Sequence, residues 1–184
     1  MSQITNKKKD IESATHIILP GVGAFPAAMK KLKELDLINP IIEAANKQKY
    51  LLGICLGMQL LFTDSEEFEK TEGLDLIKGN IIKLDKFNSN FNSKLPNIGW
   101  RNCKIDAKKK DISILKGLYS EDEFYFVHSY GLCNHKNDLN LVKSSYKNIE
   151  IPAVVNYKNI YGCQFHPEKS GMQGLKVLKN FLEL

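Results

Sequence analysis

Cys55 is the residue best placed to do chemistry, because of the residues that surround it. It ends a short apolar run and stands between Gly53 and Gly57 in the sequence GICLG. A sharp strand-to-helix turn of this form exposes one nucleophilic side chain and aims backbone N–H groups at its target. Small residues on both sides let neighbouring backbone approach closely and permit strained dihedral angles. The run therefore predicts a catalytic thiol on a nucleophile elbow.

A histidine and a carboxylate that could serve this thiol lie near the end of the chain. His166 and Glu168 flank Pro167 after a strand-like run. Residues two apart in extended chain point to the same side, so Glu168 can accept a hydrogen bond from the imidazole. The carboxylate then fixes the tautomer, and the imidazole can take the thiol proton and return one to a leaving group. A buried cysteine is otherwise an apolar filler and His-Pro-Glu a strand-end turn, but both stand at strand ends, where open sheets place ligand sites.

The segment from Pro20 to Gly23 is a third element at a strand end. Its glycines can turn a backbone N–H toward a developing oxyanion, and the helix that follows adds a favourable dipole. It is not a phosphate loop, because neither the dinucleotide glycine pattern nor a following Gly-Lys-Ser/Thr is present.

Strand-like and helical patterns alternate along the chain, which predicts an α/β fold. The first part gives a strand at 15–19, a helix from Pro26, a helical face over 38–45 and a strand at 50–54. Later strand-like runs fall at 81–84, 100–105, 124–127, 153–157 and 160–165. An amphipathic helix with Leu175, Leu178, Phe181 and Leu182 follows. With no repeat and no linker, we expect one domain over residues 1–184.

Composition narrows the class of protein further. The net charge of +5 comes from dispersed lysines, with runs only at 7–9 and 108–110, so we expect no nucleic-acid partner. No apolar stretch is long enough to span a membrane, and the polar start has no secretory pattern. The four cysteines are widely spaced, which favours free thiols in a cytoplasmic protein. His128, Cys133 and His135 match no strong ligand spacing, so neither metal nor cofactor is expected.

Five motifs carry a resemblance to a known family. They are Pro20–Phe25, Gly53–Gln59, Leu95–Trp100, Phe126–Tyr130 and Gln164–Ser170. Together they resemble class I glutamine amidotransferases, and among these the glutaminase subunits of imidazole glycerol phosphate synthases, over residues 4–184. The resemblance implies a flavodoxin-like, mostly parallel sheet flanked by helices, with an added antiparallel part.

The resemblance also implies roles for individual residues. Cys55 would attack the side-chain amide of glutamine to give a thioester and ammonia, with His166 as acid and base and Glu168 orienting it. The oxyanion would be held by the N–H of Leu56 and by one from the loop at Gly21 and Val22. Positions that hold glutamine in the family are matched by Gly57, Gln59, Ser129 and Tyr130. Ammonia would pass to a separate (β/α)8-barrel cyclase subunit that makes imidazole glycerol phosphate and AICAR, and Tyr130 and Lys169 match positions that face this partner.

The chain departs from the family pattern at its start. Nineteen residues precede Pro20, where the family has a strand, a helix and a second strand. Residues 10–14 resemble the short helix just before the Pro20 loop, and residues 4–6 resemble the end of the second strand. We therefore expect the first strand to be missing. An exposed sheet edge would then make the chain poorly stable or poorly soluble alone.

A second departure lies in Leu95–Arg101, where the family usually has His, Met and Asn at Asn97, Ile98 and Arg101. It leaves the acceptor open, so a paralogous subunit that feeds amidation of a surface sugar is an alternative. Two other functions remain as alternatives: a stand-alone cysteine hydrolase of γ-glutamyl bonds and a non-catalytic remnant.

Overall fold

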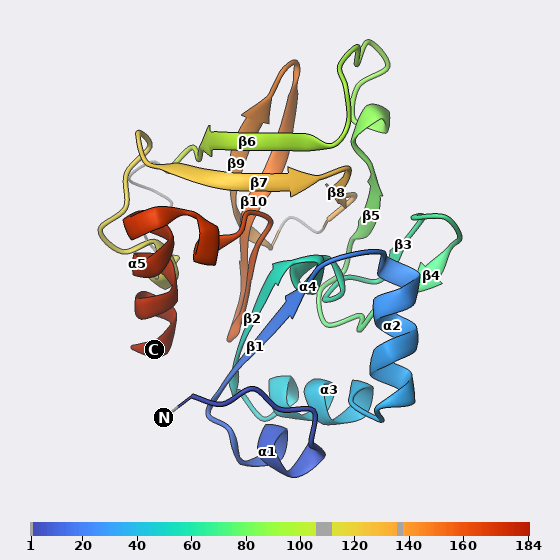
Figure 1. The fold of residues 1–184 in the computed structure, drawn as a ribbon, viewed down its shortest axis with the longest axis vertical. Helices are drawn as coiled ribbons and strands as arrows, with labels where there is room; N and C mark the ends of the chain where they lie inside the picture. Colours follow the sequence, from blue (N-terminus) through green and yellow to red (C-terminus); the bar gives the residue numbers. More distant parts are fainter. Residues whose placement is uncertain (1, 106–111, 136–137) are drawn as a thin grey trace.

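The computed structural model describes residues 2–105, 112–135 and 138–184, and a five-stranded sheet forms its centre (Figure 1). The strands are β1 (His16–Gly21), β2 (Tyr50–Cys55), β11 (Ile160–Cys163), β10 (Ile149–Tyr157) and β9 (Asn140–Tyr146), in that spatial order. β2 pairs in parallel with β1 and with β11, whereas β10 pairs antiparallel with β11 and β9. The predicted α/β architecture with an added antiparallel part is confirmed.

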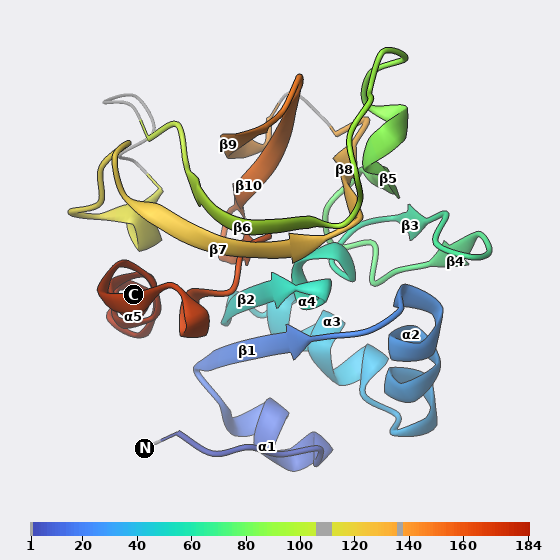
Figure 2. The ribbon, with the colours of Figure 1, turned by 45° about the horizontal axis from the view of Figure 1, so that its top comes forward.

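Helices cover the sheet from two sides (Figure 2). α1 (Lys8–Ser13), α2 (Phe25–Glu34) and α3 (Ile38–Asn46) lie on one side, and α5 (Gly171–Leu182) lies on the other. Successive side chains of β2 serve the two faces in turn: Leu51 packs in the cluster that contains α2 and α3, and Leu52 packs in the cluster that contains α5. The strand is thus buried on both faces, as expected for the parallel part of an α/β sheet.

Two smaller sheets complete the fold. One contains β4 (Thr71–Glu72), β3 (Asp64–Ser65), β5 (Asn80–Lys83) and β8 (Tyr130–Cys133). The other is an antiparallel ribbon of β6 (Asn97–Asn102) and β7 (Glu123–His128). Phe124 and Phe126 of β7 are fully buried against Phe165, which immediately precedes His166. This core places the end of β7 beside the segment that carries the candidate base.

Some predicted element bounds are wrong. Residues 4–6 form no strand, because they have no ladder partner in the part of the chain that the structure describes, and Ile4 is fully exposed. β6 begins at Asn97 and ends at Asn102, whereas the pattern predicted 100–105.

β1 pairs with β2 alone among the described strands, and Ile18 on it is 39% exposed. No helix within the described ranges combines the length and apolar character needed to cross a bilayer.

Candidate active site

Cys55 stands at the turn from β2 into the short helix α4 (Leu56–Gln59), with a positive φ of 53° and a ψ of −110°. A side chain in this region is strained, and such strain persists only where the surroundings enforce it. They do so here by close packing. An added Cβ on Gly57 would lie 1.8 Å from the carbonyl oxygen of Leu19, and one on Gly53 would lie 2.6 Å from Cα of Met58. The predicted nucleophile elbow, with glycines where backbone meets backbone, is confirmed as a conformation.

The thiol of Cys55 is buried, and burial raises its pKa to about 11, partly opposed by a hydrogen bond from the N–H of Leu56. The thiol lies 3.9 Å from the carbonyl oxygen of Val127, close enough for a weak S–H donor contact. At neutral pH the resting group is therefore a protonated thiol. Any use of it as a nucleophile needs a base and donors aimed at the sulfur.

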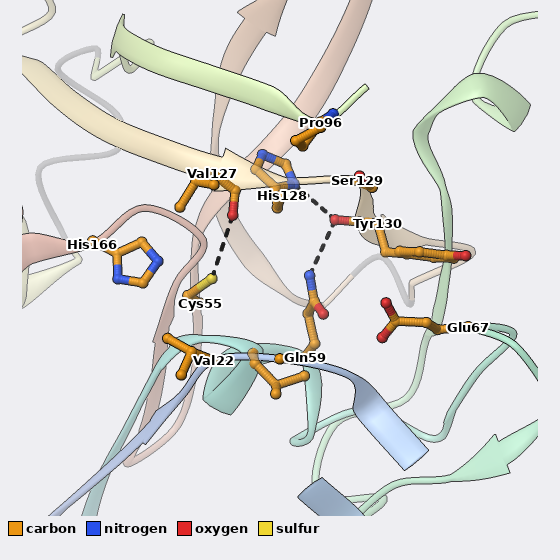
Figure 3. Close-up of a pocket in the computed structure, with 12 residues that line it drawn as sticks. Val22, Cys55, Gln59, Glu67, Pro96, Val127, His128, Ser129, Tyr130 and His166 are labelled. Carbon is orange, nitrogen blue, oxygen red and sulfur yellow. Dashed lines mark hydrogen bonds between the residues drawn. The ribbon is translucent and has the colours of Figure 1, made fainter. Parts of the chain in front are cut away.

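His166 is the candidate base, and its contact with Glu168 defines its tautomer. Its Nδ1 lies 2.7 Å from Oε1 of Glu168, and because a carboxylate only accepts, Nδ1 carries the proton. Nε2 is then the ring nitrogen left for another partner. Figure 3 shows the His166 ring beside the Cys55 sulfur, with both side chains at one end of the cavity. The predicted meeting of residues 111 positions apart in the sequence is observed.

Ser170 fixes the segment that carries His166. Its hydroxyl donates to the carbonyl of His166 at 2.6 Å and accepts from the N–H of Tyr125 at 2.9 Å. The N–H of His166 in turn donates to the carbonyl of Tyr125 at 2.9 Å. These bonds tie the turn η4 (Pro167–Lys169) to β7 and so set the position of the base relative to the sheet.

The cavity beside Cys55 has a volume of about 400 Å³ and is partly open to solvent. Seven predicted site residues line it: Val22, Cys55, Leu56, Gln59, Ser129, Tyr130 and His166. Its volume lies within the range of small-molecule sites, which is roughly 300–1,000 Å³. The elbow, the Pro20 loop and the end of β7 thus converge on one cavity (Figure 3).

Four predicted residues do not line the cavity. Gly57 and Gly21 pack behind it, and a Cβ on Gly21 would lie 2.9 Å from the N of Gly57. Glu168 reaches the cavity only through the ring of His166, and Lys169 is exposed beside it. The absence of a side chain at these two glycines therefore allows the elbow to pack closely against β1.

Glu67 is the main lining residue that the sequence did not reveal. It lies in the loop after β3, and its Oε2 accepts a hydrogen bond from the N–H of Phe25 at 2.7 Å, in the first turn of α2. Figure 3 shows its carboxylate on the Tyr130 side of the cavity, away from the thiol. Burial, with the Glu67 charge as a second cause, raises the pKa of Tyr130. No local pattern marks Glu67, because its place depends on tertiary contact between the loop after β3 and the start of α2.

A buried polar network lies behind this wall. Nδ1 of His128 donates to the carbonyl of Tyr130 at 2.7 Å, and Nδ2 of Asn97 donates to Nε2 of His128 at 3.1 Å. Burial lowers the pKa of His128 to about 4, which keeps the ring neutral and Nε2 an acceptor. Nε2 of Gln59 donates to the same Tyr130 carbonyl at 3.1 Å. The amide of Gln59 is therefore oriented by a backbone oxygen that can only accept.

These groups can carry out acyl transfer on a small polar substrate. The cavity offers a thiol on an elbow, a base oriented by a carboxylate, an amide and an acidic side chain at the far end. In the portion that the structure covers, no three metal-ligating side chains gather in one place.

Solved structures with the same fold include two that are described as glutamine amidotransferases. A glutamine amidotransferase superposes with a TM-score of 0.72 at 16% identity, covering 97% of this chain and 83% of that one. Another, from Thermotoga maritima, gives 0.59 at 18% identity, covering 94% of this chain and 65% of that one. The model of the class I glutamine amidotransferase family matches residues 1–184, and the chain belongs to this family of enzymes.

Sequence relatives place the chain more narrowly within that family. It is 47% identical over 183 residues to the imidazole glycerol phosphate synthase subunit HisH of Caldanaerobacter subterraneus, covering 100% of this chain and 86% of the relative. The HisH subunits of Geobacillus sp. and Pyrococcus furiosus are 43% and 44% identical, each covering 98% of this chain and 84% and 88% of the relative. Among class I glutamine amidotransferases the chain thus groups with HisH subunits.

Proposed function

We propose that this chain is the glutaminase subunit of an imidazole glycerol phosphate synthase. The observation that carries the proposal is the convergence of Cys55, the His166–Glu168 pair and the polar wall of Gln59 and Glu67 on one cavity of about 400 Å³. The cavity suits a small substrate with an amide at one end and charged groups at the other. Free glutamine has this form.

The first half of the reaction forms a thioester. Cys55 gives its proton to Nε2 of His166 as the sulfur bonds to the carbonyl carbon of the glutamine side chain. The N–H of Leu56 and one from the Gly21–Val22 loop stabilise the charge on the oxygen. When the tetrahedral intermediate collapses, the carbon–nitrogen bond breaks, and His166 returns the proton to the nitrogen, which leaves as ammonia.

The second half releases glutamate. His166 takes a proton from water as the water oxygen bonds to the thioester carbon. The carbon–sulfur bond then breaks, and the proton returns to the sulfur of Cys55. Glu168 accepts the hydrogen bond from Nδ1–H throughout, so that Nε2 faces the reacting atoms in both halves.

The far end of the cavity suits the amino-acid end of glutamine. The carboxylate of Glu67 can pair with the α-ammonium group, and Oε1 of Gln59 is left to accept from the substrate because Nε2 is used within the protein. Ser129 and Tyr130 border the same end. This arrangement gives glutamine a single direction of binding, with its amide toward the thiol.

The ammonia acceptor is proposed to be a (β/α)8-barrel cyclase subunit that makes imidazole glycerol phosphate and AICAR in the cytoplasm. The relatives named above are subunits of that synthase. Apolar side chains are exposed beside the site: Val22 is 80% exposed, and Ile98 and Trp100 on one face of β6 are 53% and 47% exposed. Together with Tyr130 and Lys169 they offer a surface that such a partner can cover.

The test pairs two cysteine variants in the complex with the cyclase subunit. Cys55→Ala should abolish glutamine-driven product formation and leave ammonia-driven formation at the wild-type rate. Cys133→Ala, a partly exposed cysteine outside the cavity, should leave both unchanged. Glutamine-driven turnover in Cys55→Ala, or loss of the ammonia-driven reaction, would contradict the proposal. Glutaminase activity that rises only on addition of a sugar-amidating barrel subunit would favour the paralogous function. Full glutaminase activity without any partner would favour a stand-alone hydrolase.

A further inference from the structure

Gln164 has a fully buried amide side chain, and the reaction proposed above assigns it no role. It follows β11 and stands two residues before His166, and its backbone N–H donates to the carbonyl of Ala153 at 2.8 Å. Its Oε1 accepts from Nε2 of Gln59 at 3.0 Å, and its own Nε2 lies 3.9 Å from the sulfur of Cys55. The side chain therefore connects the nucleophile to the wall that would hold glutamine.

The directions of these hydrogen bonds follow from chemistry alone. The carbonyl of Tyr130 can only accept, so the nitrogen of the Gln59 amide must face it. That nitrogen has a second hydrogen, which must meet an acceptor, so Oε1 of Gln164 faces Gln59. The nitrogen of Gln164 is then turned toward Cys55. Neither amide can flip without placing donor against donor or acceptor against acceptor.

We propose that Gln164 is a positioning residue that delivers an N–H donor to the sulfur of Cys55 and locks the Gln59 amide for substrate. The proposal rests on the proposed glutaminase function and extends it. The contact is long for the resting thiol, whose proton faces the carbonyl of Val127. Once the proton leaves, that carbonyl repels the anion, and the Gln164 N–H becomes one of the donors that stabilise it.

Alkylation of Cys55 by iodoacetamide at a series of pH values tests the donor without any substrate. Peptide mass spectrometry reads Cys55 separately from the other three cysteines. Gln164→Met keeps the side-chain length and removes both hydrogen bonds. We expect the pKa of Cys55 alkylation to rise by about one unit, which is tenfold slower alkylation at a fixed pH below that pKa. Gln48→Met, at an exposed position after α3, is the matched control and should leave the profile unchanged.

A double-mutant cycle separates this role from a merely structural one. Gln59→Met does not remove a group that donates to the sulfur, but it frees the Gln164 amide to turn, so alkylation should slow several-fold. Gln59→Met with Gln164→Met should be no slower than Gln164→Met alone. In glutamine hydrolysis, Gln164→Met should lower kcat about tenfold and raise KM, since both the anion and the Gln59 amide lose their support.

Two results would overturn the proposal. The first is a Gln164→Met protein that is folded, as judged by far-UV circular dichroism, and whose Cys55 is alkylated with the wild-type pH profile. The second is a double mutant in which the effects of Gln59→Met and Gln164→Met on the alkylation rate add. If Gln164→Met does not fold, Gln59→Met decides, because an unchanged profile there shows that the chain of amides does not reach the sulfur. A wild-type protein that fails to hydrolyse glutamine in the complex with the cyclase subunit would refute the proposed function and leave the role of Gln164 standing, since alkylation reports on Gln164 without turnover.

Discussion

Gly57→Ala is the substitution whose effect follows most directly from the geometry of the elbow. The new Cβ would begin 1.8 Å from the carbonyl oxygen of Leu19, and ordinary contact starts at 3.4 Å. The obstacle is backbone rather than a flexible side chain, because Leu19 is paired with Gly53 in the β1–β2 ladder. Relief therefore requires the elbow to move away from β1.

The loss of stability in Gly57→Ala can be estimated. Overpacking of a well-packed interior costs about 1–3 kcal/mol, and a backbone obstacle puts this case at the upper end. For a domain of this size, about 3 kcal/mol corresponds to a fall in Tm of roughly 6–12 °C. Because Cys55 moves with the elbow, glutaminase activity should fall by about a hundredfold, the loss expected for a misplacement of about 1 Å.

Thermal unfolding followed by circular dichroism, together with release of glutamate from glutamine, measures both effects. Gly171→Ala is a contrasting control: Gly171 has a positive φ of 60°, which Gly57 does not, but the atom nearest to an added Cβ there is 3.7 Å away. It should lose about 1–2 kcal/mol to strain and keep its activity. A Gly57→Ala protein with the Tm and activity of the wild type would show that the elbow does not pack against β1 as described.

Two further predictions concern the cavity wall and the buried histidine. Glu67→Gln keeps an oxygen for the N–H of Phe25 but loses the charge, so KM for glutamine should rise about 10- to 100-fold with Tm unchanged, and a loss confined to kcat would count against the proposed pairing. His128 has its pKa lowered from 6.5 to about 4, so below pH 6.5 the unfolded chain binds a proton that the folded chain does not. The free energy of unfolding should therefore fall between pH 6.5 and 4, by up to about 3 kcal/mol. Urea unfolding of His128→Gln should show a smaller fall, with His135→Gln as control, and an undiminished fall in His128→Gln would refute this cause.

Local patterns predicted the parts of this fold that depend on local geometry. The glycines around Cys55 predicted the elbow, because close backbone approach restricts residue type at single positions. The apolar run of β2 was recognised because a strand buried on both faces is apolar throughout. The outer strand β9 was missed for the opposite reason. Its buried positions alternate as a strand requires, but one of them is Ser144, whose hydroxyl is satisfied by the carbonyl of Asn102.

The candidate site divides in the same way. The sequence motifs predicted Cys55, His166 and Glu168. The place of Glu67 and the role of Gln164 depend instead on contacts between segments far apart in the sequence. Their partners are a backbone N–H and another amide, so no spacing marks them. Residues 4–6 show the reverse error, since a family pattern predicted a strand where the described chain provides no neighbour.

The protonation state of Cys55 links the core to the proposed reaction. Burial raises the pKa of Cys55 to about 11, so the thiol is protonated at pH 7 and spontaneous attack on an amide would be slow. The same burial that raises the pKa removes water, and this strengthens every donor aimed at the sulfur once the anion forms. Reactivity must then depend on groups that come from separate elements: His166 from the start of η4, Gln164 after β11 and the N–H of Leu56 from α4. A small shift of any one element should therefore lower the rate of the proposed reaction.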